Sequence, residues 1–218
     1  YMGYDSPMWY PHPAVDPERI DFVLCVRNQA LNKKPGEVSD WCVRGIESKE
    51  TYYYRGAFAD AVRAVDFVCS LPQTDATRIF ANGDSQGGAL TFVAASLDDR
   101  IRAIAPAVPF LGDYKDYFRL AEWPGKGMIE AAKAKGMSEE EMFRTLSYFD
   151  VKNFTDRITC PVIMAIGLQD PVCPPHTNFS EYNHVKSEKS YSCYPEAGHN
   201  IWQQPGWSVE KKEFFERF

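Results

Sequence analysis

Residues 79–97 contain the pattern that most constrains how this chain can fold. The apolar run IFA is followed by NGDSQGG and then by an alanine-rich apolar segment. A G-x-S-x-G sequence between a strand and a helix is typical of a nucleophile elbow, a sharp turn that lifts a serine above the sheet edge. The pattern therefore predicts a strand over 79–82, a helix over 86–97 and a catalytic hydroxyl on Ser85.

Two further roles follow from the geometry of such an elbow. The strand and the helix approach closely on either side of the serine, so the flanking positions need small residues, which Gly83 and Gly87 provide. The N–H of Gln86, the first residue of the predicted helix, points at the same space and can bind a developing oxyanion. The alternative is a glycine-rich turn whose serine only caps the helix, so the assignment depends on partners for Ser85.

A serine becomes a nucleophile only with a base and an acid that orients that base. In this architecture an acidic residue and then a histidine follow the serine, each on a loop after a strand. Asp170 comes just beyond the apolar run over 161–167, and His199 follows the run over 190–195. Chain order and position therefore predict Asp170 as the orienting acid and His199 as the base.

The other histidines and nearby acids fit these roles less well. His12 precedes the serine in a proline-rich stretch, His176 begins a predicted helix, and His184 falls inside that helix. Asp84 points away from the expected position of the base, and Asp156 precedes its strand instead of following it. We interpret these five as surface or structural residues.

Apolar runs and helical patterns alternate along the chain. Besides the elbow, the patterns predict strands over 20–26, 101–105, 161–167 and 190–195, and helices over 52–70, 175–185 and 209–218. Strands that alternate with helices form a mostly parallel sheet flanked by helices, which is the α/β class. With 218 residues and no linker or repeat, the chain is predicted to be a single domain over 1–218.

The strand pattern stops between about residues 110 and 149. This stretch is rich in aromatic residues and has two helical patches, the second of which begins with a capping box of Ser138 and Glu141. An aromatic insertion of this length predicts a lid or cap. A helix pair that packs far from the site is the alternative.

Composition argues against several classes of function. The net charge of −6, without a basic patch, argues against a nucleic-acid partner. No apolar run approaches the roughly 18 residues of a membrane span, and no signal peptide is visible. The six cysteines form no C-x-x-C pair, so no metal site is expected, and the proposed chemistry requires no cofactor. Cysteine pairing stays open, as does the compartment, for which a bacterial cytoplasm and periplasm both fit.

Taken together, these motifs resemble the acetyl xylan esterase and cephalosporin C deacetylase family of α/β-hydrolases. The matching segments are GDSQGG at 83–88, YYYR at 52–55 with Asp60 and Arg63-Ala64, and GLQD at 167–170 leading to CPP at 173–175. The resemblance runs nearly end to end. It implies a serine esterase that removes acetyl groups from small or oligomeric sugars, with Ser85, Asp170 and His199 as its triad.

The resemblance also implies a second oxyanion donor. In the family's H-G-Y element the tyrosine N–H has this role, and Met2-Gly3-Tyr4 stands in that place, so Tyr4 is the expected donor. Two motifs depart from the family: R-G-Q is Arg27-Asn28-Gln29 here, and H-E is His199-Asn200. We therefore expect different hydrogen bonds around the triad and a different acyl or alcohol preference.

The family's fold has more strands than this chain provides. The strand leading into Tyr4 lies inside that sheet, and at least two further strands precede it. Since an open slot would expose unpaired backbone groups, we expect the N-terminal strands to be missing and the 218 residues to be the C-terminal part of a longer protein. The resemblance also suggests a ring-like homo-oligomer whose sites face inward.

Two alternatives to an acetyl esterase stay open. A peptidase of the prolyl oligopeptidase type shares G-x-S-x-G-G and a similar triad order, but it needs anchors for the amino end of a peptide, and the sequence has no convincing acidic pair. A decayed hydrolase that serves as a binding module would be expected to have lost at least one member of the triad.

Overall fold

A four-stranded parallel sheet forms the centre of the molecule. The computed structural model describes residues 1–6, 19–121 and 123–218. Within these ranges the strands, in spatial order, are β1 (Ile79–Asp84), β2 (Ile101–Ala107), β3 (Val162–Gly167) and β4 (Lys189–Tyr194). All four are parallel, so their carboxyl ends lie at one edge of the sheet. This confirms the predicted parallel sheet.

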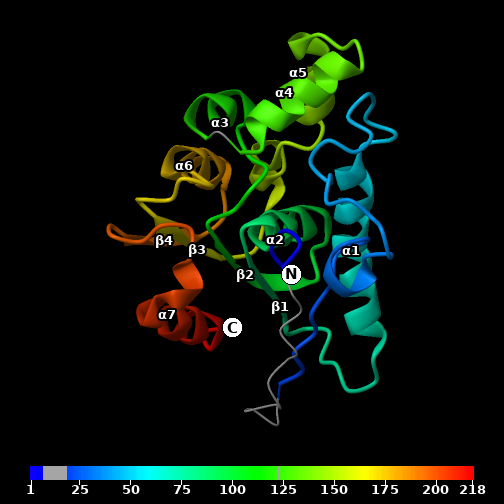
Figure 1. Cartoon of the computed structure of the whole chain (residues 1–218). Coiled ribbons are helices and arrows are strands. Elements are labelled where there is room, and N and C mark those ends of the chain that lie inside the picture. The colour runs from blue at the N-terminus through cyan, green and yellow to red at the C-terminus, as the bar shows by residue number, and fades with distance from the viewer. Residues whose placement is uncertain (7–18, 122) are drawn as a thin grey trace.

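Helices lie on both faces of this sheet. In the described residues they are α1 (Tyr53–Ser70), α2 (Gln86–Leu97), α3 (Tyr114–Leu120), α4 (Gly125–Ala134), α5 (Glu139–Ser147), α6 (Pro175–His184) and α7 (Pro205–Phe215). Figure 1 shows α2 and α6 on one face of the sheet and α7 on the other, with α1 outside α2. The α/β class is thus confirmed.

Burial explains why the central elements form where they do. β3 is buried along its entire length, as expected of a parallel strand covered on both faces. α2 is buried from Gln86 to Ala95, because β1, β2 and α1 all pack against it. On the opposite face, the ring of Phe80 from β1 stacks on Phe215 of α7 with centroids 5.1 Å apart.

The predicted strand over residues 20–26 is wrong. This segment has no regular secondary structure and pairs with no strand in the described part of the chain. Val26 is buried, but Ile20 and Phe22 are exposed. The ring of Phe22 packs against that of Phe67 in α1, with the ring centroids 5.2 Å apart. This apolar run is thus partly buried, with Phe22 against α1, but it does not form a strand.

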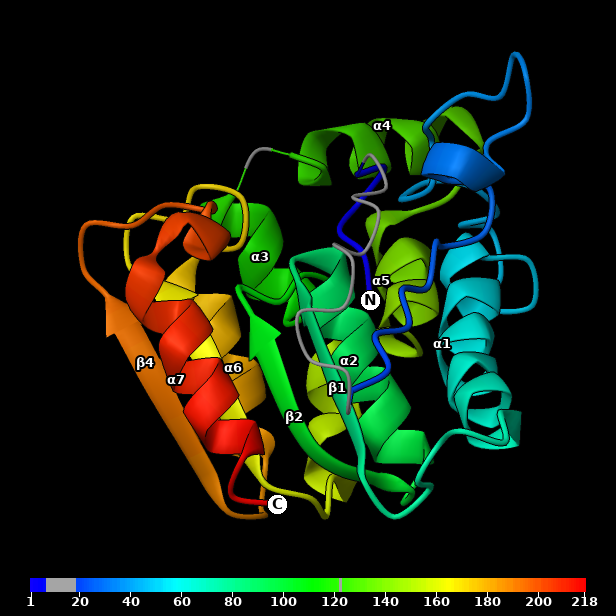
Figure 2. The same ribbon diagram turned by 90° about the horizontal axis from the view of Figure 1, so that it is seen from below.

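The insertion after β2 contains α3, α4 and α5, one helix more than predicted. The capping box of α5 is confirmed: Ser138 Oγ accepts the N–H of Glu141, and the Glu141 carboxylate accepts the N–H of Ser138. Figure 2 shows α4 near the end of the sheet toward which β2 points. The insertion therefore reaches the edge of the sheet where the predicted site residues lie.

The segment before α1 is the least regular part of the chain. Between residues 19 and 52 the only helical element is the short 3-10 turn η1 (Ala30–Asn32), and the remaining residues form turns and extended loops. The proline-rich stretch predicted around His12 lies outside the described residues. None of the helices in the described ranges has the length and apolar character that crossing a bilayer requires.

Candidate active site

Ser85 occupies a strained turn between β1 and α2. Its backbone has φ 57° and ψ −122°, a conformation that a residue with a Cβ rarely adopts. The Ser85 N–H donates to the carbonyl of Ala107 (2.9 Å), and the Ser85 carbonyl accepts the N–H of Phe110 (3.1 Å). A Cβ on Gly83 would lie 2.6 Å from the carbonyl of Gly87, so the close approach of strand and helix requires glycine there.

A histidine and an aspartate meet on the loops after β3 and β4. His199 Nδ1 lies 2.8 Å from Asp170 Oδ2, and the Asp170 side chain is completely buried while that of His199 is 20% exposed. The other oxygen of Asp170 accepts the N–H groups of Val172 (2.8 Å) and Cys173 (2.9 Å). The carboxylate is thus held in one orientation, and Nε2 is the nitrogen of His199 that faces away from it.

Cys173 connects this pair with Ser85. Its thiol lies within 4.8 Å of ligand atoms of both Asp170 and His199, and it also interacts with the Ser85 hydroxyl. Burial raises the pKa of the thiol well above its ordinary value, and the contact with Ser85 only partly opposes this. Cys173 is therefore a neutral group at the centre of the three predicted residues. The sequence analysis noted Cys173 only as part of the CPP segment, three residues after Asp170, and gave it no role at the site.

Two groups in the described residues have donor atoms close enough for a metal ion. Asp170, Cys173 and His199 form the first, but their mutual hydrogen bonds and neutral thiol account for their placement. Asp113, Asp116 and His176 form the second. There His176 Nε2 lies 2.9 Å from Asp116, and the ammonium of Lys152 already pairs with Asp113 at 2.6 Å. Neither group favours a metal.

The N-terminal residues lie against the elbow. The side-chain amide of Gln86 donates to the carbonyl of Met2 (3.4 Å), and a Cβ on Gly87 would lie 2.3 Å from the carbonyl oxygen of Tyr1. Gly3, which precedes Tyr4, is also close to the elbow, since a Cβ on it would lie 3.6 Å from the carbonyl oxygen of Asp84. As the first residue of α2, Gln86 also has an N–H without an acceptor inside the helix.

A buried pair of side-chain amides joins the elbow to the irregular segment before α1. The side chains of Gln29 and Gln86 exchange hydrogen bonds of 2.9 and 3.1 Å. The Tyr54 hydroxyl donates to Gln86 (3.1 Å), Gln29 donates to the Tyr53 hydroxyl (2.9 Å), and the N–H of Asp5 donates to Gln29 (2.7 Å). The polar atoms of Gln86 are therefore well satisfied in a fully buried position.

Asn28 stands at the glycine position of R-G-Q and has a left-handed backbone. Asn28 has φ 60°, in the left-handed region that glycine and asparagine enter most readily, and its amide donates to Glu37. Arg27 makes two hydrogen bonds of 2.6 Å to Asp60, and its guanidinium lies where a Cβ on Gly56 would be. Asparagine can thus occupy this glycine-like position, and its side chain makes a polar contact that glycine could not make.

Two half-exposed tryptophans contact the predicted site residues. Trp123, in the connection between α3 and α4, is 50% exposed; it packs edge-on against Tyr4 (5.3 Å) and stacks on Phe110 (5.8 Å). Trp202 is also 50% exposed and packs edge-on against His199 at 6.2 Å. Aromatic surface is thus available beside both Tyr4 and His199.

The remaining candidates lie elsewhere or have other partners. His176 and His184 are exposed, with Asp116 and the carbonyl of Ser180 as their respective partners. Asp156 makes an ion pair with Lys186. Burial raises the pKa of Asp84, and the charges of Lys211 and His199 oppose that rise. His12 lies outside the described residues.

Comparison with known proteins assigns the fold. The chain resembles the acetyl xylan esterase of Paenibacillus sp. R4 with a TM-score of 0.82 and 32% identity, covering 100% of this chain and 72% of that one. For acetyl xylan esterase 1 of Thermoanaerobacterium sp. JW/SL YS485 the TM-score is 0.77 and the identity 31%, and the match covers 87% of this chain and 63% of that one. An acylaminoacyl peptidase of Pyrococcus horikoshii has a TM-score of 0.62 but an identity of only 16%, so this likeness concerns the fold alone.

Sequence comparison agrees with this. The acetyl esterase Axe7A of Xylanibacter ruminicola is 36% identical over 149 residues, which are 68% of this chain and 33% of that protein. The chain therefore spans about a third of the length of this curated relative. The profile of the family described as acetyl xylan esterase (AXE1) matches residues 2–216. With almost every residue inside that match, this chain belongs to the acetyl xylan esterase family.

Proposed function

We propose that this chain is the catalytic domain of a serine esterase that removes acetyl groups from acetylated sugars. One observation carries the proposal: the Cys173 thiol, which interacts with the hydroxyl of Ser85 on its strained turn, also lies within 4.8 Å of ligand atoms of the hydrogen-bonded pair of His199 and Asp170. Membership of the acetyl xylan esterase family supports the same reaction. Ser85 is the nucleophile, His199 the general base and Asp170 the acid that orients it.

The reaction proceeds in two acyl-transfer steps. Ser85 Oγ attacks the acetyl carbonyl carbon while His199 takes the hydroxyl proton, and Asp170 stabilises the imidazolium that results. His199 then gives this proton to the departing sugar oxygen, which leaves acetyl-Ser85. A water molecule attacks the acetyl-enzyme by the reverse path and releases acetate. The N–H groups of Gln86 and Tyr4 bind the oxyanion, each contributing about a hundredfold to a thousandfold in rate.

The aromatic surroundings favour a sugar as the alcohol. The leaving oxygen must be close to His199 to receive its proton, and the exposed indole of Trp202 lies on that side. Trp123 offers a second exposed ring next to Tyr4, so the insertion of α3 to α5 acts as a cap. Aromatic rings with one buried and one exposed face suit ligands that are partly apolar, such as pyranose rings.

The test compares the longest natural form of the protein with its Ser85→Ala variant on ethyl acetate and on acetylated xylo-oligosaccharides. We expect hydrolysis of both esters, with a higher kcat/KM on the sugar ester and no catalysed hydrolysis by the variant. Equal rates for the two proteins would disprove the role of Ser85. Turnover of peptide amides without turnover of acetate esters would favour a peptidase instead.

A further inference from the structure

The turn that carries Tyr4 has an unusual backbone. The N–H of Ser6 donates to the carbonyl of Gly3 (3.3 Å), which closes a turn with Tyr4 and Asp5 at its centre. Asp5 has φ 45°, in the left-handed region that residues with a Cβ avoid. Aspartate tolerates this conformation better than most residues, but the turn needs outside contacts to stay in it.

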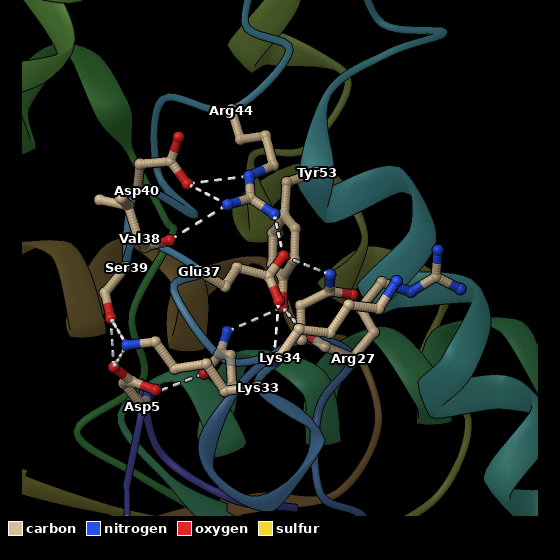
Figure 3. A network of polar contacts seen from close by, with 12 residues as sticks. Asp5, Arg27, Lys33, Lys34, Glu37, Val38, Ser39, Asp40, Arg44 and Tyr53 are labelled. Carbon is tan, nitrogen blue, oxygen red and sulfur yellow. Dashed lines mark hydrogen bonds and ion pairs between the residues drawn. The ribbon is translucent and has the colours of Figure 1, made fainter.

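Asp5 receives those contacts on both its backbone and its side chain. Its N–H donates to Gln29, as described above, and its carboxylate accepts hydrogen bonds from the N–H of Ala30 (3.2 Å), the hydroxyl of Ser39 and the ammonium of Lys33 (3.4 Å). Figure 3 shows Asp5, Ser39 and Lys33 close together at one side of the 27–44 loop. The irregular loop thus supplies every donor that this carboxylate uses in the described structure.

Charge strengthens these hydrogen bonds. Burial by itself would raise the pKa of the Asp5 carboxyl, but the hydrogen bonds from Ser39, Ala30 and Lys33 together lower it. The carboxylate therefore stays ionised near neutral pH, and hydrogen bonds to an ionised acceptor are stronger than those to a neutral one.

Tyr4 is consequently held from two directions. Its ring packs edge-on against Trp123, and its hydroxyl donates to the carbonyl of Ser39 (3.3 Å). Ser39 thus contacts both central residues of the turn, with its carbonyl toward Tyr4 and its hydroxyl toward Asp5. The Gly3 carbonyl and the Tyr4 N–H belong to one planar peptide unit, so the hydrogen bond from Ser6 to Gly3 that closes the turn also fixes the direction of this N–H.

We propose that Asp5 is a positioning residue for the esterase reaction: its carboxylate fixes the Gly3–Ser6 turn, so that the Tyr4 N–H is directed at the oxyanion. This inference rests on the proposed function, because it assigns Tyr4 as an oxyanion donor. Asp5 itself touches no reacting atom. It acts through the geometry of the residue before it, and a small misplacement of a donor has a large effect on rate.

The experiment uses Asp5→Ala and Asp5→Asn, with Glu37→Gln as the matched control. Glu37 is a carboxylate of the 27–44 loop; it binds Arg44, Asn28 and the N–H of Lys34 and has none of the Tyr4 turn among these partners. For an acetate ester we expect Asp5→Ala to lower kcat about tenfold to a hundredfold with little change in KM. Asp5→Asn, which keeps one acceptor oxygen, is intermediate, and Glu37→Gln stays close to wild type.

A second substrate shows whether the loss lies in the oxyanion hole. In a thionoacetate ester the attacked carbonyl oxygen is replaced by sulfur, a weak hydrogen-bond acceptor, so a displaced N–H costs that substrate less. The ratio of acetate to thionoacetate kcat therefore falls in Asp5→Ala and is unchanged in Glu37→Gln. An unchanged ratio in Asp5→Ala, or equal losses in both variants, would overturn the role of Asp5 alone. A wild-type protein that hydrolyses neither ester would overturn the proposed function together with this inference.

Discussion

The two proposed oxyanion donors come from regions that are held in place by different kinds of contact. Gln86 belongs to the elbow, where backbone hydrogen bonds of β1, β2 and α2 surround a turn with no space for side chains. Tyr4 belongs to a turn whose conformation depends on side-chain contacts with an irregular loop. One proposed donor is thus held by regular secondary structure and the other by polar side chains.

This difference has consequences for substitution. A side chain added at a glycine of the elbow meets backbone atoms, which cannot move without displacing the sheet. A residue changed in the 27–44 loop removes one of several parallel hydrogen bonds, and the others remain. We therefore expect steep losses around Ser85 and graded losses around Tyr4, and the predictions below are ordered from the largest effect to the smallest.

The largest effect is expected for Asp170→Asn. The amide can no longer hold His199 in the tautomer that accepts the serine proton, so kcat/KM should fall by about 10⁴. Steady-state hydrolysis of an acetate ester measures the change, and the thermal midpoint of the variant checks that it is folded. A loss of less than tenfold would mean that Asp170 does not orient the base.

Gly87→Ala tests the backbone-held region directly. The added Cβ would lie 2.3 Å from the carbonyl oxygen of Tyr1, so we expect a loss of about 1–3 kcal/mol in the free energy of unfolding. The matched control is Gly127→Ala in α4, where a Cβ meets nothing within 4 Å and should stabilise the helix by about 0.5–1 kcal/mol. Chemical denaturation measures both, and a similar change in both variants would contradict the tight elbow.

Glu181→Gln tests a buried carboxyl that packs against Gly112, in the segment that follows β2. Glu181 on α6 is fully buried, both carboxyl oxygens lack a partner among the described residues, and one lies where a Cβ on Gly112 would be. Burial, followed by the charges of Asp150 and Asp113, raises the pKa of Glu181 well above its ordinary value of 4.5. The native carboxyl therefore keeps its proton to a higher pH than the same group does in the unfolded chain.

The sign of the pH effect follows from this shift. Below pH 4.5 the carboxyl is mostly protonated in both states, whereas as pH rises above 4.5 the unfolded chain ionises before the native protein does. Wild type should therefore lose stability relative to Glu181→Gln as pH rises, by at most about 1.4 kcal/mol per pH unit. Denaturation of both proteins at pH 5 and pH 7 measures this. A constant difference between them would show that Glu181 is ionised in the native state.

The smallest effect is expected for Lys33→Ala in the side-chain-held region. The ion pair with Asp5 is partly exposed, and Ser39 and Ala30 still hold the carboxylate, so kcat should fall by less than about fivefold. Salt screens exposed pairs, so the difference from wild type should shrink in 1 M NaCl, where the Debye length is about 3 Å. A loss in kcat as large as that of Asp5→Ala would mean that Lys33 alone holds the Asp5 carboxylate, and that Ser39 and Ala30 do not contribute.

The sequence predicted the backbone-held region well and the side-chain-held region poorly. β1 and α2 follow from local patterns, because apolar runs and a G-x-S-x-G turn act over a few residues, whereas the catalytic roles of Ser85, Asp170 and His199 stay a prediction. The contacts of Asp5 with Ser39 and Lys33 join residues about thirty positions apart in a segment without periodicity. No local pattern encodes them.

The errors have the same cause. Residues 20–26 have the apolar composition of a strand, but whether such a run pairs depends on a neighbouring strand with free backbone groups. Cys173 lies three residues after Asp170, but only the fold brings its thiol close to Ser85 and His199 as well.

The most direct test of the central claim is covalent labelling of Ser85. A serine-reactive phosphonate is incubated with the longest natural form of the protein and with its Ser85→Ala and His199→Ala variants, and the labelled peptide is identified by mass spectrometry. The account predicts one label per chain on Ser85, none in Ser85→Ala and much slower labelling in His199→Ala. Labelling of a different residue, or the same label in Ser85→Ala, would contradict it.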